Sequence, residues 1–300
     1  MRKYLVIWLM IFPLSMFAEH LFEFGLHGGL AGWSAQHVYV SPQVGFQGGA
    51  QVYYTWLSPW VIGLRTGVNI DSHNASFGRS NYEDTYSTID VEDRRMEVSY
   101  TIGRLRERYS FWSAGIPLQL ALAYKGVLFF GGAKAVFPFS GSWRETAENT
   151  ALSVYYPDQD NRVYESYPLA ASRNFKMETS GTVPLPAVQW WLALELSYAV
   201  PIRVGAHHKS YLMVGAYFDY CFTRHSAARS DAESLIMLTD TRDGFPLQRI
   251  LTPVMTGNRQ GQRLIDGCSP FDVGIKISYA IAPYDPHRSA SRACHCLPNE

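Results

Sequence analysis

Three groups of residues in the 300-residue chain have the types and spacing that chemistry requires. Asp71, Ser72 and His73 are consecutive, and His225 follows much later. A histidine that accepts the proton of a serine, and is oriented by a carboxylate, activates a hydroxyl nucleophile. These residues suit a hydrolase only if the fold turns their side chains toward one another.

The four cysteines form the other two groups. Cys221 and Cys268 are far apart in sequence, and a fold that brought them together could join them in a disulfide. Cys294, His295 and Cys296 lie near the C-terminus. Two cysteines and one histidine at this spacing do not match the known zinc patterns, so a tail disulfide or cross-link is the simpler interpretation, and no metal site is predicted.

The N-terminus predicts export of the chain. Arg2 and Lys3 precede an apolar run from Tyr4 to Phe17, and Ala18 ends the run. This is the layout of a secretory signal peptide over residues 1–18. No later segment has the ~20 consecutive apolar residues of a transmembrane helix.

Charge and composition exclude one class of function. The 26 basic and 26 acidic residues balance, whereas a nucleic-acid-binding protein carries a basic excess or a basic stripe. Only 17% of the residues are charged and 14% are aromatic, against about 25% charged in ordinary soluble proteins. Such values suit a sheet with one face in lipid.

Alternation of apolar and polar residues is the main structural signal. In residues 44–56, the even-numbered positions include Val44, Phe46 and Trp56, whereas Gln47 and Gln51 lie at odd positions. Successive side chains of a strand point to opposite faces, so this segment predicts a strand with one apolar face. The pattern recurs in eight segments: 21–32, 44–56, 60–71, 111–123, 127–139, 188–200, 211–222 and 271–281.

The connections between these segments favour a membrane barrel. The three long ones, 72–110, 140–186 and 223–268, all fall at the same end of an up-and-down arrangement. Outer-membrane barrels have short periplasmic turns and longer extracellular loops. We therefore expect an all-β chain with an eight-stranded antiparallel up-and-down transmembrane β-barrel over 19–283, three long extracellular loops and a periplasmic tail over 284–300. A soluble barrel or sandwich, with the apolar positions inside, stays open.

In a membrane barrel the polar positions face the lumen. An eight-stranded barrel is just wide enough for side chains to fill it, and charges there must be paired or hydrated. A sealed, charge-paired core is the preferred interpretation, and a narrow polar conduit is the alternative. The predicted lumen network is Glu23, Arg65, Asp71, Lys134, Glu195, Asp219, Asp272 and Lys276.

The barrel also places the other candidates. Cys221 ends one strand and Cys268 begins the next, both with inward parity, so a disulfide there would staple the base of the last loop. His73 and His225 would lie at the outer rim, where polar rim residues are the simpler interpretation. The loops 140–186 and 223–268 are too apolar for disorder. They would pack on one another as a cap, extend the strands or form a binding surface. Packing as a cap is preferred, and residues 82–108 are expected to be charged and solvated.

Several short motifs resemble the PorT-like outer-membrane β-barrel proteins of Bacteroidetes. They are the glycines of the first strand (Gly25, Gly28, Gly29) and the segments 113–120, 131–134 and 272–279. The resemblance covers the strand regions, and it implies an eight-stranded barrel without enzymatic activity. Some relatives serve protein secretion. The chain departs from the usual barrel ending because it continues well past Tyr279 and Ile281.

These observations predict a non-enzymatic protein of the cell outer membrane. It would be a structural, adhesion or assembly component that acts through its extracellular loops, without a cofactor. Outer-membrane lipid would surround it, and a protein or glycan would be its partner. A rim-site lipid hydrolase and a narrow small-solute channel are the alternatives.

Overall fold

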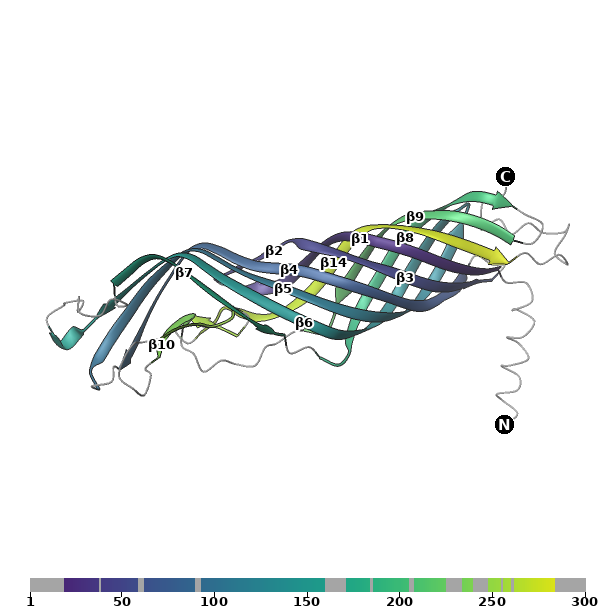
Figure 1. Ribbon diagram of the computed structural model, residues 1–300. Coiled ribbons are helices and arrows are strands. Elements are labelled where there is room, and N and C mark those ends of the chain that lie inside the picture. Colours follow the sequence, from purple (N-terminus) through teal and green to yellow (C-terminus); the bar gives the residue numbers. More distant parts are fainter. Residues whose placement is uncertain are drawn as a thin grey trace, which may run out of the picture.

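The computed structural model shows a closed β-barrel with a long sheet that continues beyond one rim (Figure 1). It describes residues 19–37, 39–58, 62–89, 93–159, 171–183, 186–204, 208–224, 234–239, 248–254, 256–259 and 262–283. The predicted signal peptide and C-terminal tail lie outside these residues. In the described part of the chain, no helix is both long and apolar enough to cross a membrane.

Eight antiparallel strands form the barrel, which confirms the predicted fold class. Each strand pairs with the next one in the ring, and β14 closes on β1 through a register that runs from Phe22↔Ile281 to Ala35↔Cys268. The ring consists of β1 (Glu19–His37), β3 (Gly45–Leu57), β4 (Ile62–Ile89), β5 (Arg95–Tyr124), β6 (Val127–Tyr155), β8 (Gln189–Val204), β9 (His208–Cys221) and β14 (Ile265–Pro283).

Short turns join strands at the end where β1 begins. Lys125 and Gly126 both have positive φ, 48° and 85°, as the two-residue turn of a tight hairpin requires. The long connections leave from the opposite end. They hold β7 (Ala171–Thr182), the 3₁₀ turn η1 (Pro157–Gln159) and four short strands, β10 (Ile236–Thr239), β11 (Gln248–Leu251), β12 (Asn258–Arg259) and β13 (Gln262–Arg263), while β2 (Ser41–Gln43) pairs with β4.

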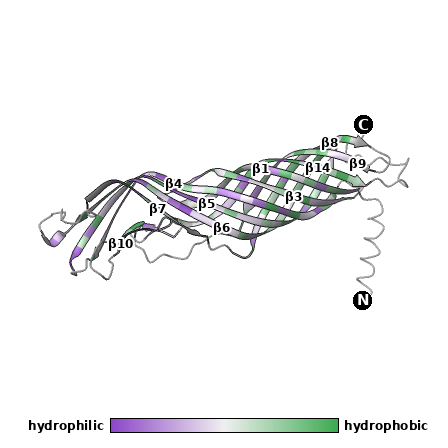
Figure 2. Cartoon of the chain, in the orientation of Figure 1, coloured by the Kyte–Doolittle hydropathy of each residue, from purple (hydrophilic) through white to green (hydrophobic). Residues whose placement is uncertain are grey.

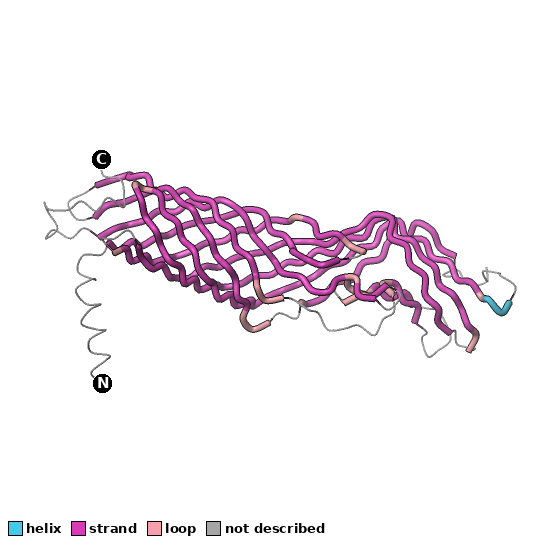
Figure 3. Tube along the Cα trace, turned by 180° about the vertical axis from the view of Figure 1, so that it is seen from behind, coloured by secondary structure: helices cyan, strands magenta, loops and turns pink. Residues whose placement is uncertain are grey.

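Three strands are far longer than the barrel needs. β4, β5 and β6 have 28, 30 and 29 residues, whereas about 9–11 residues cross a bilayer. Their outer halves, together with β7, form what we call the outer sheet (Figure 3). The preferred cap is therefore wrong for residues 140–155 and 171–182, where the alternative of extended strands holds.

A one-residue bulge marks the rim in β6. Trp112 of β5 pairs with Ser140 and Ser113 pairs with Pro138, so Phe139 is the extra residue. On the barrel side of the bulge, the odd-numbered Phe137 points outward, and on the outer-sheet side the odd-numbered Glu145 is buried. The bulge thus exchanges the two faces of β6 between the barrel and the outer sheet.

A second row of irregular residues crosses the outer sheet, and we call it the crease. Asn81, Asn149 and Asn174 have positive φ of 53°, 53° and 58°, a region that asparagine tolerates. The register places Gly103 of β5 between Asn81 of β4 and Asn149 of β6. The buried side of β4 changes from odd numbers (Phe77) to even numbers (Tyr82) across this row. Outside the barrel, β4 to β7 bend together (Figure 1).

The inner face of the outer sheet carries the largest hydrophobic core. Residues 82–108 were expected to be solvated, but the described parts, 82–89 and 93–108, alternate between exposed side chains and fully buried ones such as Tyr82, Val98 and Ile102. Parts of the last long connection pack against them, including Leu235, Leu251 and other residues. The described parts of that connection do form a cover, which packs mainly on the strands and also places Arg259 over the Tyr39 ring of the first connection. The period-two alternation of residues 82–102 in the sequence indicates strands with one buried face.

Close packing of the barrel wall leads to a first prediction. A Cβ at Gly29 would lie 2.1 Å from the backbone oxygen of Val273 on β14, whereas a Cβ at the neighbouring Gly28 meets nothing closer than 3.6 Å. We expect Gly29→Ala to lower the free energy of unfolding by about 1–3 kcal/mol, the usual cost of overpacking. Urea titration of the protein in detergent micelles measures this cost. Gly28→Ala is the matched control, and equal effects of the two changes would contradict the prediction.

Candidate functional site

The outside of the barrel is a continuous apolar surface. Large hydrophobic side chains of the even-numbered parity, among them Leu26, Phe46 and Leu118, are 68%, 75% and 64% exposed. Hydrophobic colouring is concentrated on the barrel part of the strands (Figure 2). A soluble barrel would place these side chains inside. An apolar band around a closed barrel is solvated by lipid, so the barrel is the membrane-spanning part.

The lumen holds all eight predicted network residues, arranged in two groups. Arg65, Lys276, Glu23 and Glu195 form the first group. The Arg65 guanidinium bridges Glu195 Oε2 (2.7 Å) and Glu23 Oε2 (3.1 Å), and Lys276 Nζ contacts Glu23 Oε1 (2.8 Å) and also Glu195. Each cation therefore meets both carboxylates, in a closed ring of four charges.

Aromatic rings hold the central cation of this group in place. The Arg65 guanidinium carbon lies 4.2 Å from the Tyr53 ring centre and 4.0 Å from that of Phe130. Arg65 is fully buried. A planar guanidinium can stack on rings while it binds carboxylates at its edge, which a lysine ammonium cannot do.

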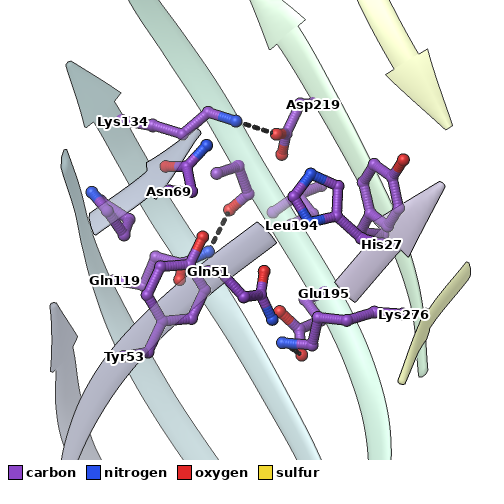
Figure 4. Close-up of a pocket in the computed structure, with 13 residues that line it drawn as sticks. His27, Gln51, Tyr53, Asn69, Gln119, Lys134, Leu194, Glu195, Asp219 and Lys276 are labelled. Atoms are coloured by element: carbon purple, nitrogen blue, oxygen red, sulfur yellow. Dashed lines mark hydrogen bonds and ion pairs between the residues drawn. The ribbon is translucent and has the colours of Figure 1, made fainter. Parts of the chain in front are cut away.

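The second group lies around Asp71. Lys134 contacts Asp219 and lies 3.7 Å from Asp71 Oδ2, and the Lys134–Asp219 contact is drawn in Figure 4. His27 Nε2 lies 2.8 Å from Asp71 Oδ1. His73 Nδ1 lies 2.9 Å from Asp272 Oδ2, and its ring stacks on Phe111.

Two histidines join the predicted lumen network. The predicted network has five carboxylates but only Arg65, Lys134 and Lys276 as cations. The structure adds His27 beside Asp71 and His73 beside Asp272. Each imidazole gives one of these carboxylates a further polar partner. His73 was expected at the rim and His27 was not predicted as a network residue, although both share the inward parity of the neighbouring network residues.

The cavity between the two groups of lumen charges is small. The cavity between the two groups has a volume of about 30 Å³ and is lined by residues of both groups, including Lys134, Glu195 and Lys276 (Figure 4). One water needs a cavity of roughly 10–15 Å³ on this measure, so there is space for one or two waters and not for a file of hydrated ions. This geometry supports a sealed core over a conduit.

The residues considered for hydrolysis do not assemble in the described part of the chain. Asp71 and His73 point into the lumen, whereas Ser72 lies between them with the opposite parity. His73 is 2% exposed and pairs with Asp272 in place of a serine. His225 lies outside the described residues, so its placement stays a prediction.

The predicted Cys221–Cys268 disulfide is absent from the described structure, which has both residues as buried thiols. The register explains this result. Phe271 pairs with Tyr220, so Cys268 lies two positions beyond the residue opposite Cys221. Cα atoms at such diagonal positions are about 7–8 Å apart, and disulfides join Cα atoms at about 4.4–6.8 Å. The Cys221 thiol instead donates to the Thr223 carbonyl oxygen at 3.3 Å.

A buried polar cluster ties the last long connection to the outer sheet. Ser234 Oγ donates to Asp84 Oδ2 (2.5 Å) and lies 2.6 Å from the Tyr100 hydroxyl. That hydroxyl also accepts from the backbone N–H of Leu235 (3.1 Å). Three elements distant in sequence thus share one network, which makes the outer sheet and its cover a single packed unit.

Two glutamates face each other between the rim and the crease. Glu107 of β5 and Glu145 of β6 pair across the strands, and both are fully buried. Glu107 accepts hydrogen bonds from the Tyr109 hydroxyl and from the backbone N–H of Val254 (2.6 Å). Burial and the neighbouring Glu107 charge raise the pKa of Glu145 well above its ordinary value. Glu145 therefore carries a proton when an exposed glutamate has lost it.

The outward face of the sheet between the rim and the crease is basic, which was not predicted from the sequence. We call the residues between rim and crease, 74–80, 104–110, 140–148 and 175–182, the collar. A hollow of about 270 Å³ lies on its outward face. The hollow is lined by Arg104, Arg106, Arg108, Arg144, Thr146, Glu148 and Lys176. Arginines at every second position of a strand share one face, so the spacing of Arg104, Arg106 and Arg108 indicates a basic face.

No protein-family model and no curated protein matches the chain. Among solved structures it is similar to the attachment invasion locus protein Ail of Yersinia pestis, crystallised with the heparin analogue sucrose octasulfate. The similarity has 8% sequence identity and a TM-score of 0.21, and it covers 88% of this chain and 99% of that chain.

Proposed function

We propose that this protein is a non-enzymatic component of the outer membrane, whose sealed barrel anchors a rigid sheet outside the cell. Residues 1–18 would direct export and be removed, and 284–300 would form a periplasmic tail. The outer sheet would serve as a structural, adhesion or assembly surface, for a protein or glycan partner. A place among the PorT-like proteins of Bacteroidetes belongs to the same proposal.

The single observation that carries this proposal is the packed core of the outer sheet. A barrel that served only as a pore or an anchor needs short connections, whereas here a cluster of 25 buried residues in the described chain continues from the rim of the barrel into the outer sheet. Ordering so many residues costs conformational entropy that only extensive burial offsets. The filled lumen argues against the channel, and the outward parity of Ser72 argues against the rim hydrolase.

Trypsin treatment of intact cells tests the location and the orientation together. We expect the protein in the outer-membrane fraction, with a band that shifts on heating. Trypsin should cut at the β4–β5 tip, where Arg95 is exposed, and leave the barrel intact. Arg95→Gln combined with Arg94→Gln should remove that cut. Cleavage only after the membrane is permeabilised would contradict the proposed orientation.

Two further measurements address the alternatives. Reconstitution in planar bilayers should give no steady conductance, and steps of regular size would favour the channel. The lipid composition of cells with His73→Ala should match that of cells with the unchanged protein. A difference in lipid acylation that depends on His73 would favour the hydrolase.

A further inference from the structure

We propose that the hollow on the outward face of the collar binds the phosphate groups of a glycolipid headgroup in the outer leaflet. The proposal rests on the proposed outer-membrane location. It adds a ligand of defined chemistry to a face that the alternation pattern alone left as solvated surface.

The charges around the hollow are unevenly matched. Arg144 Nε contacts Glu178 at 3.1 Å, and Lys176 Nζ lies 3.9 Å from Glu148 and 3.7 Å from Glu178. The two glutamates are thus engaged on the β6–β7 side. No ion pair is described for Arg104, Arg106 or Arg108, and five cations face two carboxylates around the hollow.

Two details of the arrangement favour an anion as the ligand of the hollow. Arg108 pairs directly with Arg144 across the β5–β6 ladder, and like charges at directly opposed positions destabilise a sheet. The Nε atom of Arg106 is buried without a hydrogen-bond partner, which costs free energy until an acceptor arrives. A phosphate in the hollow would relieve the repulsion between the arginines and accept from their N–H groups.

The surroundings of the arginines suit a sugar phosphate. Ser110, Ser142 and Ser180 share the outward parity in β5, β6 and β7, and none of them is fully buried. Hydroxyl groups hydrogen-bond with saccharide hydroxyls, and arginine forks bind phosphate oxygens in pairs. The volume of about 270 Å³ is slightly below that of a drug-sized pocket, so it suits one or two charged groups of a larger ligand.

The position of the hollow favours a membrane lipid over a soluble glycan as its ligand. Arg104, Arg106 and Arg108 have the same parity on β5 as the exposed Trp112, Ile116 and Leu118 of the apolar band. The hollow therefore faces sideways, directly above the lipid that surrounds the barrel. Trp112 and Arg108 are four residues apart, about 13 Å along the strand and roughly 10 Å along the membrane normal at the usual tilt. Phospholipid headgroups form a layer only about 5–8 Å thick on each side of the hydrocarbon core. A phosphate carried on a sugar extends farther from the core, so it reaches the hollow better than a phospholipid phosphate does.

Binding of lipid A to the purified full-length barrel in detergent tests the proposal, with native mass spectrometry as the readout. We expect bis-phosphorylated lipid A to bind, and the same lipid without its phosphates to bind at least tenfold more weakly. Arg106→Gln and Arg108→Gln should each weaken binding about tenfold, the loss expected for one charge-assisted hydrogen bond. Arg95→Gln removes an exposed arginine of the same strand beyond the crease, and it should change binding less than twofold.

Dextran sulfate serves as the soluble polyanion in a parallel titration. Equal binding of phosphorylated and dephosphorylated lipid A, or full binding by the Arg106→Gln/Arg108→Gln variant, would overturn the proposal. Arginine-dependent binding of dextran sulfate without binding of lipid A would overturn the membrane source and assign the hollow to a free glycan. The heat-shifted band of each variant reports the folded barrel, so a failure of lipid binding is separate from a failure of the proposed location.

Discussion

Arg65→Met should lower the free energy of unfolding by about 3–5 kcal/mol, the usual cost of removing one partner from a buried ion pair. The change leaves Glu23 and Glu195 buried, with Lys276 as the remaining cation of their group. It also removes the guanidinium from between Tyr53 and Phe130. Urea titration in lipid vesicles, with the heat-shifted band as readout, measures the loss.

Two controls separate this charge effect from a loss of volume. Arg95→Met makes the same chemical change at an exposed site, and we expect a change below about 0.5 kcal/mol. Arg65→Met combined with Glu195→Gln should recover part of the loss, because Lys276 and Glu23 then remain as one balanced ion pair. A loss below 1 kcal/mol for Arg65→Met alone would mean that the ring of four charges does not hold the lumen together.

Glu145→Gln should make the protein more stable at neutral pH and weaken its pH dependence. Burial and Glu107 raise the pKa of Glu145 in the folded protein. The folded state then holds a proton that the unfolded chain has already released. Stability consequently falls as the pH rises from the ordinary glutamate pKa of about 4.3 toward the raised value, by up to about 1.4 kcal/mol per pH unit.

The measurement is the unfolding free energy at several pH values between 5 and 8, for the unchanged protein and for Glu145→Gln. The neutral amide keeps the shape of the side chain, and it carries no charge to repel Glu107. Glu148→Gln is the matched control, because Glu148 lies three residues away on the outward face and is not buried. A steeper decline with pH in Glu145→Gln than in the unchanged protein would contradict the assignment.

Alternation carried most of the fold prediction because lipid and lumen differ so strongly in polarity. Eight strands, their neighbours and their inward residues follow from a period of two, and Arg65 and Lys276 were assigned to the lumen on that basis alone. The exact partners were not predictable, because register decides which carboxylate each cation meets. The same limit explains the disulfide: parity placed Cys221 and Cys268 on the inward side, but an offset of two residues separates them.

Extended strands were only an alternative to the preferred cap for residues 140–186, because the strands of the outer sheet interrupt their own period. The bulge at Phe139 and the crease residue Asn149 each exchange the faces of β6. Odd-numbered or even-numbered residues therefore do not stay on one face along the whole strand. Within the short window of residues 96–102, apolar and polar side chains alternate as clearly as in any barrel strand. The basic hollow was missed for a related reason, since its cations come from three strands whose neighbours were not yet known.

The crease also determines how much room each molecule takes up in the plane of the membrane. Four strands bend together outside the barrel (Figure 1), so their tip does not stand above the ring that carries it. The projected outline of the molecule is then wider than the ring itself. In a crowded membrane, neighbouring copies would meet at the overhanging tips before their barrels touch, and lipid would fill the gap below. A left-handed backbone at three asparagines would thus set the closest spacing between molecules.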